Sequence, residues 1–154
     1  MLQRIAARIH PTTWWLLAIV FAVIAGTASA LWQTAAIAAL SIALILLFRE
    51  NATWARSLGF YLTLAAAVIV IRILFRMVFS FSSDEDQILF HLPSLTLNLG
   101  LGEINLFGNV SLRSIMGAML DGSRLAAIIL AVAIANTLAN PKKLLKSAPG
   151  ALYE

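Results

Sequence analysis

Apolar residues fill the chain from 11 to 48, a stretch of 38 residues without a charged side chain. A helix rises about 1.5 Å per residue, so about 20 residues cross a hydrocarbon core of about 30 Å. Because unpaired backbone amides are costly in lipid, the surplus favours two short helices joined by a tight turn. Small, weakly helix-forming residues at 26–29 place that turn. We therefore predict helices over about 11–26 and 31–48.

Two further apolar segments, 57–79 and 112–139, are each long enough to cross a membrane. The polar region between them, 80–111, contains acidic residues but no lysine or arginine. Leucine alternates there with polar residues or glycine from 95 to 102, and the alternation resumes at Ile104. This is the period of a strand with one buried face. The pattern predicts either a short β-hairpin or an irregular loop outside the bundle.

Composition places the chain outside the soluble class. The sequence is 61% apolar and 12% charged, against about 25% charged residues in soluble domains. We therefore expect an all-α membrane protein with about four transmembrane helices, one membrane domain over 1–139, and membrane lipid as a partner. The eleven basic residues are scattered singly and form no continuous cationic face, so we expect no nucleic-acid partner.

The distribution of basic residues predicts the orientation, because short loops rich in lysine and arginine remain cytoplasmic. With four spans, three basic segments fall on one side and the acidic region falls on the other. We expect a multi-pass protein of the cell membrane with both termini cytoplasmic. The basic residues are Arg4, Arg8, Arg49, Arg56, Lys142, Lys143 and Lys146.

A cleavable signal peptide is an alternative interpretation of the first apolar segment. Arg4 and Arg8 precede an apolar stretch, and 28–30 (Ala-Ser-Ala) fits a cleavage site. The apolar pattern resumes at once, which favours a retained span. The intact mass of the purified protein would decide between the two.

Four of the charged residues inside the predicted spans form two closely spaced pairs. Arg72 and Arg76 lie four residues apart on one helix face, and Asp121 and Arg124 lie three apart. A charge at the bilayer centre costs at least about 2.5 kcal/mol, so such residues usually pair or face a wet surface. Two arrangements follow: a buried network with Asp121 as the acid, or arginines that extend outward to the acidic residues at 84–86. Either a structural or a transport role is compatible with both.

Sequence motifs for catalysis are missing from the chain. It contains no cysteine, no HExxH or GxSxG motif and no glycine-rich phosphate loop. His10 and His91 are expected on opposite membrane faces, where they cannot share a metal ion. We therefore expect a non-enzymatic protein with no catalytic residues, no metal site and no cofactor.

Small residues recur in the fourth span, where they would allow a neighbouring helix to approach closely. They form a specific packing face or reflect the general frequency of alanine and glycine in membrane helices. The residues are Gly117, Ala118, Gly122, Ser123, Ala126 and Ala127.

The tail from 140 to 154 follows the fourth span directly and carries an Asn-Pro-x-x-Leu-Leu-x-x-x-Pro pattern. A Gly-Ser-Arg-Leu segment at 122–125 precedes it, and His-Pro at 10–11 and Trp-Trp at 14–15 open the chain. In this order the motifs resemble the transmembrane T component of energy-coupling factor transporters, the cobalt-permease-like family. The residues of the tail pattern are Asn140, Pro141, Lys142, Leu144, Leu145 and Pro149.

This resemblance implies a subunit of an ATP-driven bacterial importer of vitamins or transition-metal ions. Its implied partners are a substrate-capturing S-type membrane subunit, which chooses the substrate, and two ATP-binding-cassette ATPases. The tail residues would then begin the cytoplasmic coupling region. The family's long coupling helices, which carry Ala-Arg-Gly or Ala-Arg-Ser motifs, are missing, because the sequence ends at Glu154. An Ala-Arg-Ser at 55–57 lies in the short link before the third span and is interpreted as a coincidence. We expect a fragment, a truncated product or a shortened relative.

Two other classes of membrane protein remain open. A small self-associating protein could use the fourth span as its packing face, without ATPase partners. A substrate-capturing subunit would need about six spans and a polar pocket, whereas the pattern predicts four spans.

Overall fold

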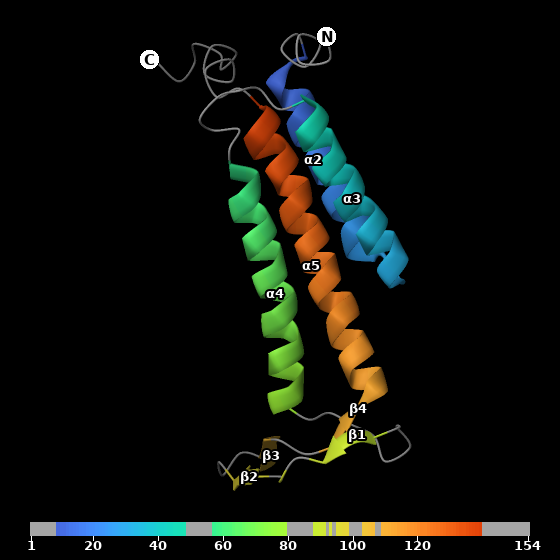
Figure 1. Ribbon diagram of the computed structural model, residues 1–154, viewed down its shortest axis with the longest axis vertical. Helices are drawn as coiled ribbons and strands as arrows, with labels where there is room; N and C mark the ends of the chain where they lie inside the picture. Colours follow the sequence, from blue (N-terminus) through green and yellow to red (C-terminus); the bar gives the residue numbers. More distant parts are fainter. Residues whose placement is uncertain are drawn as a thin grey trace.

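The computed structural model describes residues 9–48, 57–79, 88–91, 93, 95–98, 103–106 and 109–139. Within these ranges the chain forms three α-helices, then four short strands, and then a fourth α-helix (Figure 1). The helices are α2 (Pro11–Thr27), α3 (Leu31–Phe48), α4 (Leu58–Val78) and α5 (Leu112–Leu138). The four helices predicted from the sequence are confirmed, and each observed boundary lies within one residue of the predicted one.

Local hydrogen bonds fix where these helices begin. Pro11 is the first residue of α2, where its missing N–H is not needed, and the His10 side chain accepts from the Thr12 amide. Ser111 caps α5, because its buried hydroxyl accepts a hydrogen bond from the Ser114 amide at 3.1 Å. The cap therefore sets the point at which the preceding strand segment, 109–111, becomes helix.

The turn between α2 and α3 is closed by a side chain of α3. Gln33 Oε1 accepts from the Ser29 amide at 2.8 Å and from the Ala30 amide at 3.2 Å. Both amides precede α3 and have no partner within the helix, so the glutamine satisfies them. The reversal lies at 28–30, slightly later than the predicted position at 26–29.

Helix α5 occupies the centre of the bundle and contacts α2, α3 and α4, whereas α2 and α3 contact each other only slightly. The start of α2, the end of α3, the start of α4 and the end of α5 lie at one end of the molecule (Figure 1). With 17 and 18 residues, α2 and α3 extend about 26 and 27 Å, whereas the 27 residues of α5 extend about 40 Å. The first half of α5, next to the strands, therefore packs mainly against α4.

The core lies around the last four turns of α5. Ile134 is fully buried there against Ile45 of α3 and Trp14 of α2, and the Trp14 and Phe48 rings pack at 5.8 Å. Alanine dominates the buried positions of α5, which lets three helices surround it closely. The fully buried alanines of α5 are Ala127, Ala131, Ala133 and Ala135.

The strands form two nested antiparallel pairs at the opposite end of the bundle (Figure 1). The inner pair joins β2 (Leu95–Asn98) to β3 (Glu103–Leu106), so of the two predicted alternatives, a β-hairpin or an irregular loop, the structure has paired strands. The outer pair joins β1 (Ile88–His91) to β4 (Asn109–Ser111) and was not predicted. Because β4 ends where α5 begins, the β1–β4 pair is attached directly to the central helix.

Candidate functional site: the charged end of the bundle

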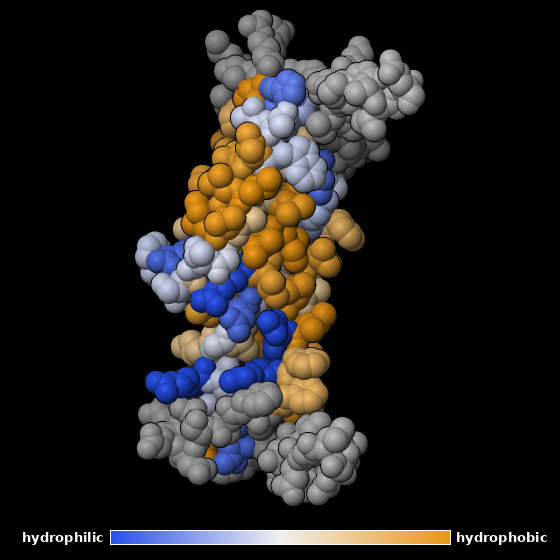
Figure 2. Space-filling view, turned by 180° about the vertical axis from the view of Figure 1, so that it is seen from behind, coloured by the Kyte–Doolittle hydropathy of each residue, from blue (hydrophilic) through white to orange (hydrophobic). Residues whose placement is uncertain are grey.

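The four charged residues of these two pairs occupy one level of the bundle. Arg72 lies 14 residues after the start of α4 and Arg124 lies 14 residues before the end of α5, about 21 Å along each axis. Hydrophilic residues gather in this part of the molecule, below a broad apolar region (Figure 2). We call Arg72, Arg76, Asp121 and Arg124 the charged layer.

Arg124 connects α5 to the turn between α2 and α3. Its Nη1 lies 3.0 Å from Asp121 Oδ1, and its Nε donates to the Ala28 carbonyl at 2.7 Å. Ala28 follows the last residue of α2, where helix carbonyls lack partners and the helix dipole favours a positive charge. Sequence spacing identified the pair with Asp121 but not the bond to Ala28, which spans 96 residues.

Arg76 and Arg72 differ in how they are held. Arg76 Nε donates to the buried Ser114 hydroxyl at 2.6 Å, which links α4 to the first turn of α5. Arg72 forms no hydrogen bond or ion pair with the residues that the structure describes. The structure thus joins Asp121 to Arg124 alone within the charged layer. The acidic residues at 84–86 lie outside the described residues.

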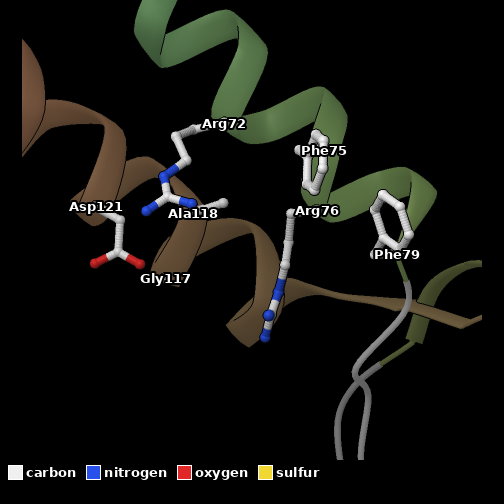
Figure 3. A pocket seen from close by; sticks show the side chains of 7 residues that line it. All are labelled: Arg72, Phe75, Arg76, Phe79, Gly117, Ala118 and Asp121. Atoms are coloured by element: carbon white, nitrogen blue, oxygen red, sulfur yellow. The ribbon is translucent and has the colours of Figure 1, made fainter.

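A cavity of about 370 Å³ opens between α4 and α5 at this level (Figure 3). The arginines extend from α4 toward α5, and the Phe75 and Phe79 rings stack beside them at 4.7 Å. Gly117 and Ala118 line the α5 side of the cavity, and their small size leaves this space unfilled. The lining residues are Arg72, Phe75, Arg76, Phe79, Gly117, Ala118 and Asp121.

Gly122 sets the distance between α4 and α5 next to this cavity. A Cβ atom at this position would lie 3.1 Å from the Ile69 Cα and 3.4 Å from the Arg72 Cβ. Gly117, by contrast, has no atom within 4 Å of a Cβ built on it. The predicted small face is therefore a packing face against α4, centred on Gly122 rather than on Gly117. Its buried members at four-residue spacing are Ser114, Ala118, Gly122 and Ala126.

A hydroxyl pair connects α3 to α5. The Thr34 and Ser123 hydroxyl oxygens lie 2.9 Å apart, and Thr34 is 1% exposed. Each hydroxyl also lies within hydrogen-bond distance of a carbonyl of its own helix, so both remain satisfied if the other is removed.

We expect a double-mutant cycle of Thr34→Val and Ser123→Ala to give a coupling energy of about 0.6 kcal/mol, the average for such bonds in a membrane bundle. Thermal unfolding in detergent measures it, with Ser41→Ala as the control, because the buried Ser41 hydroxyl bonds only within α3, to the Ile37 carbonyl. Additive effects of the two substitutions would show that this contact does not stabilise the bundle.

No family model, curated protein or solved structure matches this chain. The described residues contain no group of three or more histidine, aspartate and glutamate side chains that could hold a metal ion. The predicted coupling residues, Asn140 to Pro149, lie outside the described residues. The charged layer and its cavity are therefore the part of the described chain where polar chemistry is concentrated.

Proposed function

We propose that the chain is an integral membrane protein whose four helices lie across the bilayer. Three of them, α3, α4 and α5, are long and apolar enough to cross, and α2 is apolar but shorter. The observation that carries the proposal is the outward face of the bundle, because α3 and α4 bury few residues and expose large apolar side chains. Contiguous exposed apolar surfaces of this kind mark membrane or protein contact sites, because soluble monomers rarely expose them.

Exposed aromatic residues agree with this placement. Trp15 near the start of α2 is 39% exposed, and Trp32 at the start of α3 is 70% exposed. The two lie at opposite ends of the short helices, and tryptophan favours the two membrane–water boundaries. The basic segments at 4–8 and 49–56 favour a cytoplasmic location for the end of the bundle where α2 begins and α3 ends.

Single-cysteine labelling tests this orientation without background, because the chain contains no cysteine. We expect a membrane-impermeant maleimide to label Ser83→Cys in intact cells, and to label Thr53→Cys only after the membrane is opened. Labelling of both positions from the same side would contradict the four-span arrangement.

Within this class we propose a non-enzymatic scaffold subunit of an energy-coupling factor importer, the T component or its amino-terminal portion. The order of the sequence motifs supports this assignment. Two features of the fold are compatible with it: apolar outer faces that a membrane subunit could contact, and a bundle end where four helix ends gather. On this proposal the substrate subunit selects the vitamin or metal ion, and the ATPases bind at the cytoplasmic end.

Purification of the tagged protein from native membranes tests the assignment. We expect two ATP-binding-cassette ATPases and a small membrane subunit to be recovered with it, at a constant ratio in mild detergent. Recovery of the chain as a homo-oligomer without ATPases would instead support a small self-associating membrane protein. In that case the contact would use another surface, because α4 already covers the small face of α5.

A further inference from the structure

The cavity of the charged layer contains one arginine, Arg72, that has no acidic partner among the described residues. Two arginines and one carboxylate line it, and that carboxylate, Asp121, is already paired with Arg124 at 3.0 Å. This pair leaves Arg72 as a positive charge without a carboxylate partner in the part of the chain that the structure describes. Next to a hydrocarbon region such a charge is unfavourable unless an anion compensates it.

Arg72 has donors to offer to that anion. A guanidinium group presents five N–H donors in a planar fork that matches a phosphate group. Arg72 uses none of them on the described residues, and its side chain extends across the cavity toward α5 (Figure 3). Arg76 lies one turn away, where the bond from its Nε to Ser114 fixes the orientation of its guanidinium plane.

The surroundings of the cavity favour a lipid over a free ion. Large apolar side chains next to Arg72 point outward from α4, with Ile71 59%, Leu74 54% and Phe75 59% exposed. Figure 2 shows an apolar surface that begins beside the hydrophilic residues and continues along the helices. A headgroup at the arginines would therefore leave room for its acyl chains along the bundle.

We propose that this cavity binds the phosphate of an anionic phospholipid headgroup, with Arg72 as its principal ligand and Arg76 beside it. This inference rests on the proposed membrane location. Arg72 would then be neutralised by lipid. Inorganic phosphate has the same chemistry, so the test includes it as a separate ligand.

Native mass spectrometry of the protein in detergent tests this, with phosphatidylglycerol and phosphatidylcholine added in equal amounts. We expect the wild-type protein to retain phosphatidylglycerol preferentially. Arg72→Gln should reduce this preference about tenfold, the effect of losing one charge-assisted hydrogen bond. Arg113→Gln is the matched control, because Arg113 is an exposed arginine of α5 that does not line the cavity. The control should retain the preference.

A second variant removes space instead of charge. Gly117→Leu places a side chain in the cavity without a clash at its Cβ, and should lower lipid retention as Arg72→Gln does. Displacement of phosphatidylglycerol by inorganic phosphate would assign the site to free phosphate, and insensitivity to it would assign the site to the lipid.

Two results overturn the proposal: equal retention of the two lipids by the wild-type protein, or equal losses in Arg72→Gln and Arg113→Gln. If Arg72→Gln does not fold, the wild-type comparison and Gly117→Leu still decide. Failure of the membrane proposal is distinguishable, because the protein would then be recovered in the aqueous fraction before lipid is added.

Discussion

Replacing Gly122 by leucine should separate α4 from α5 and lower the free energy of unfolding by about 3 kcal/mol, the upper end of the usual cost of overpacking. The reason is that even a methyl group at this position would meet the backbone of α4, with 3.1 Å between its Cβ and the Ile69 Cα. Backbone cannot rotate away as the end of a flexible side chain can, so the helices must move apart. Thermal unfolding in detergent, followed by tryptophan fluorescence, measures the loss.

Gly117 provides the control for this prediction on the same helix. Gly117→Leu introduces the same side chain only five residues away, into open space, and should not lower the free energy of unfolding, because leucine also favours helix over glycine. Replacing glycine by alanine should change the free energy of unfolding in opposite directions at the two positions. Alanine favours helix over glycine by up to about 1 kcal/mol where its methyl group meets nothing, as at 117. Equal losses in both leucine variants would show that Gly122 is not the contact that positions α4.

The four helices could be predicted from the sequence because each rests on a local property. The uncharged stretch 11–48 is too long for one membrane-spanning helix and too short for two helices of about 20 residues with a loop between them, so it requires a hairpin of two short helices. Pro11 and Ser111 then mark helix starts through backbone groups that lie within three residues of them. Such local signals can be recognised without knowing which helices contact one another.

The exact turn could not be predicted from glycine alone. Gly26 lies inside α2, and the reversal follows two residues later, where the Gln33 side chain holds the amides of Ser29 and Ala30. A flexible residue permits a turn, whereas the acceptor that satisfies the free amides decides its position. The β1–β4 pair was missed for a related reason. Three consecutive apolar residues, 88–90, show no alternation, and their partners are about 20 residues away.

The central place of α5 and the arrangement of the charged layer depend on packing between distant segments. Spacing placed Asp121 beside Arg124, but it could not show that Arg124 reaches the turn at Ala28 or that Arg76 binds Ser114. The contact with Ala28 arises because α2 ends about level with Arg124 along α5. Among the described helices, the short α2–α3 hairpin thus leaves the first half of α5 mainly to α4, and this is where the cavity opens.

Removal of the Arg124 side chain should lower stability more than removal of the Asp121 charge. Arg124→Leu loses a charge-assisted hydrogen bond and leaves the Ala28 carbonyl without this donor, which costs about 1.5 kcal/mol for a side chain that is 32% exposed. Asp121→Asn keeps that bond and weakens only an exposed pair within α5, worth about 0.5 kcal/mol.

Thermal unfolding in detergent compares the two variants, and limited proteolysis identifies where the structure opens. Because Arg124 is a contact between α5 and the reversal at 28–30, its loss should release α2 and α3 first, and cleavage should appear at that turn well below the unfolding temperature. Asp121→Asn should not show this cleavage. If both variants are equally destabilised and neither is cleaved at the turn, Arg124 acts through its ion pair, and the hairpin is held by apolar packing alone.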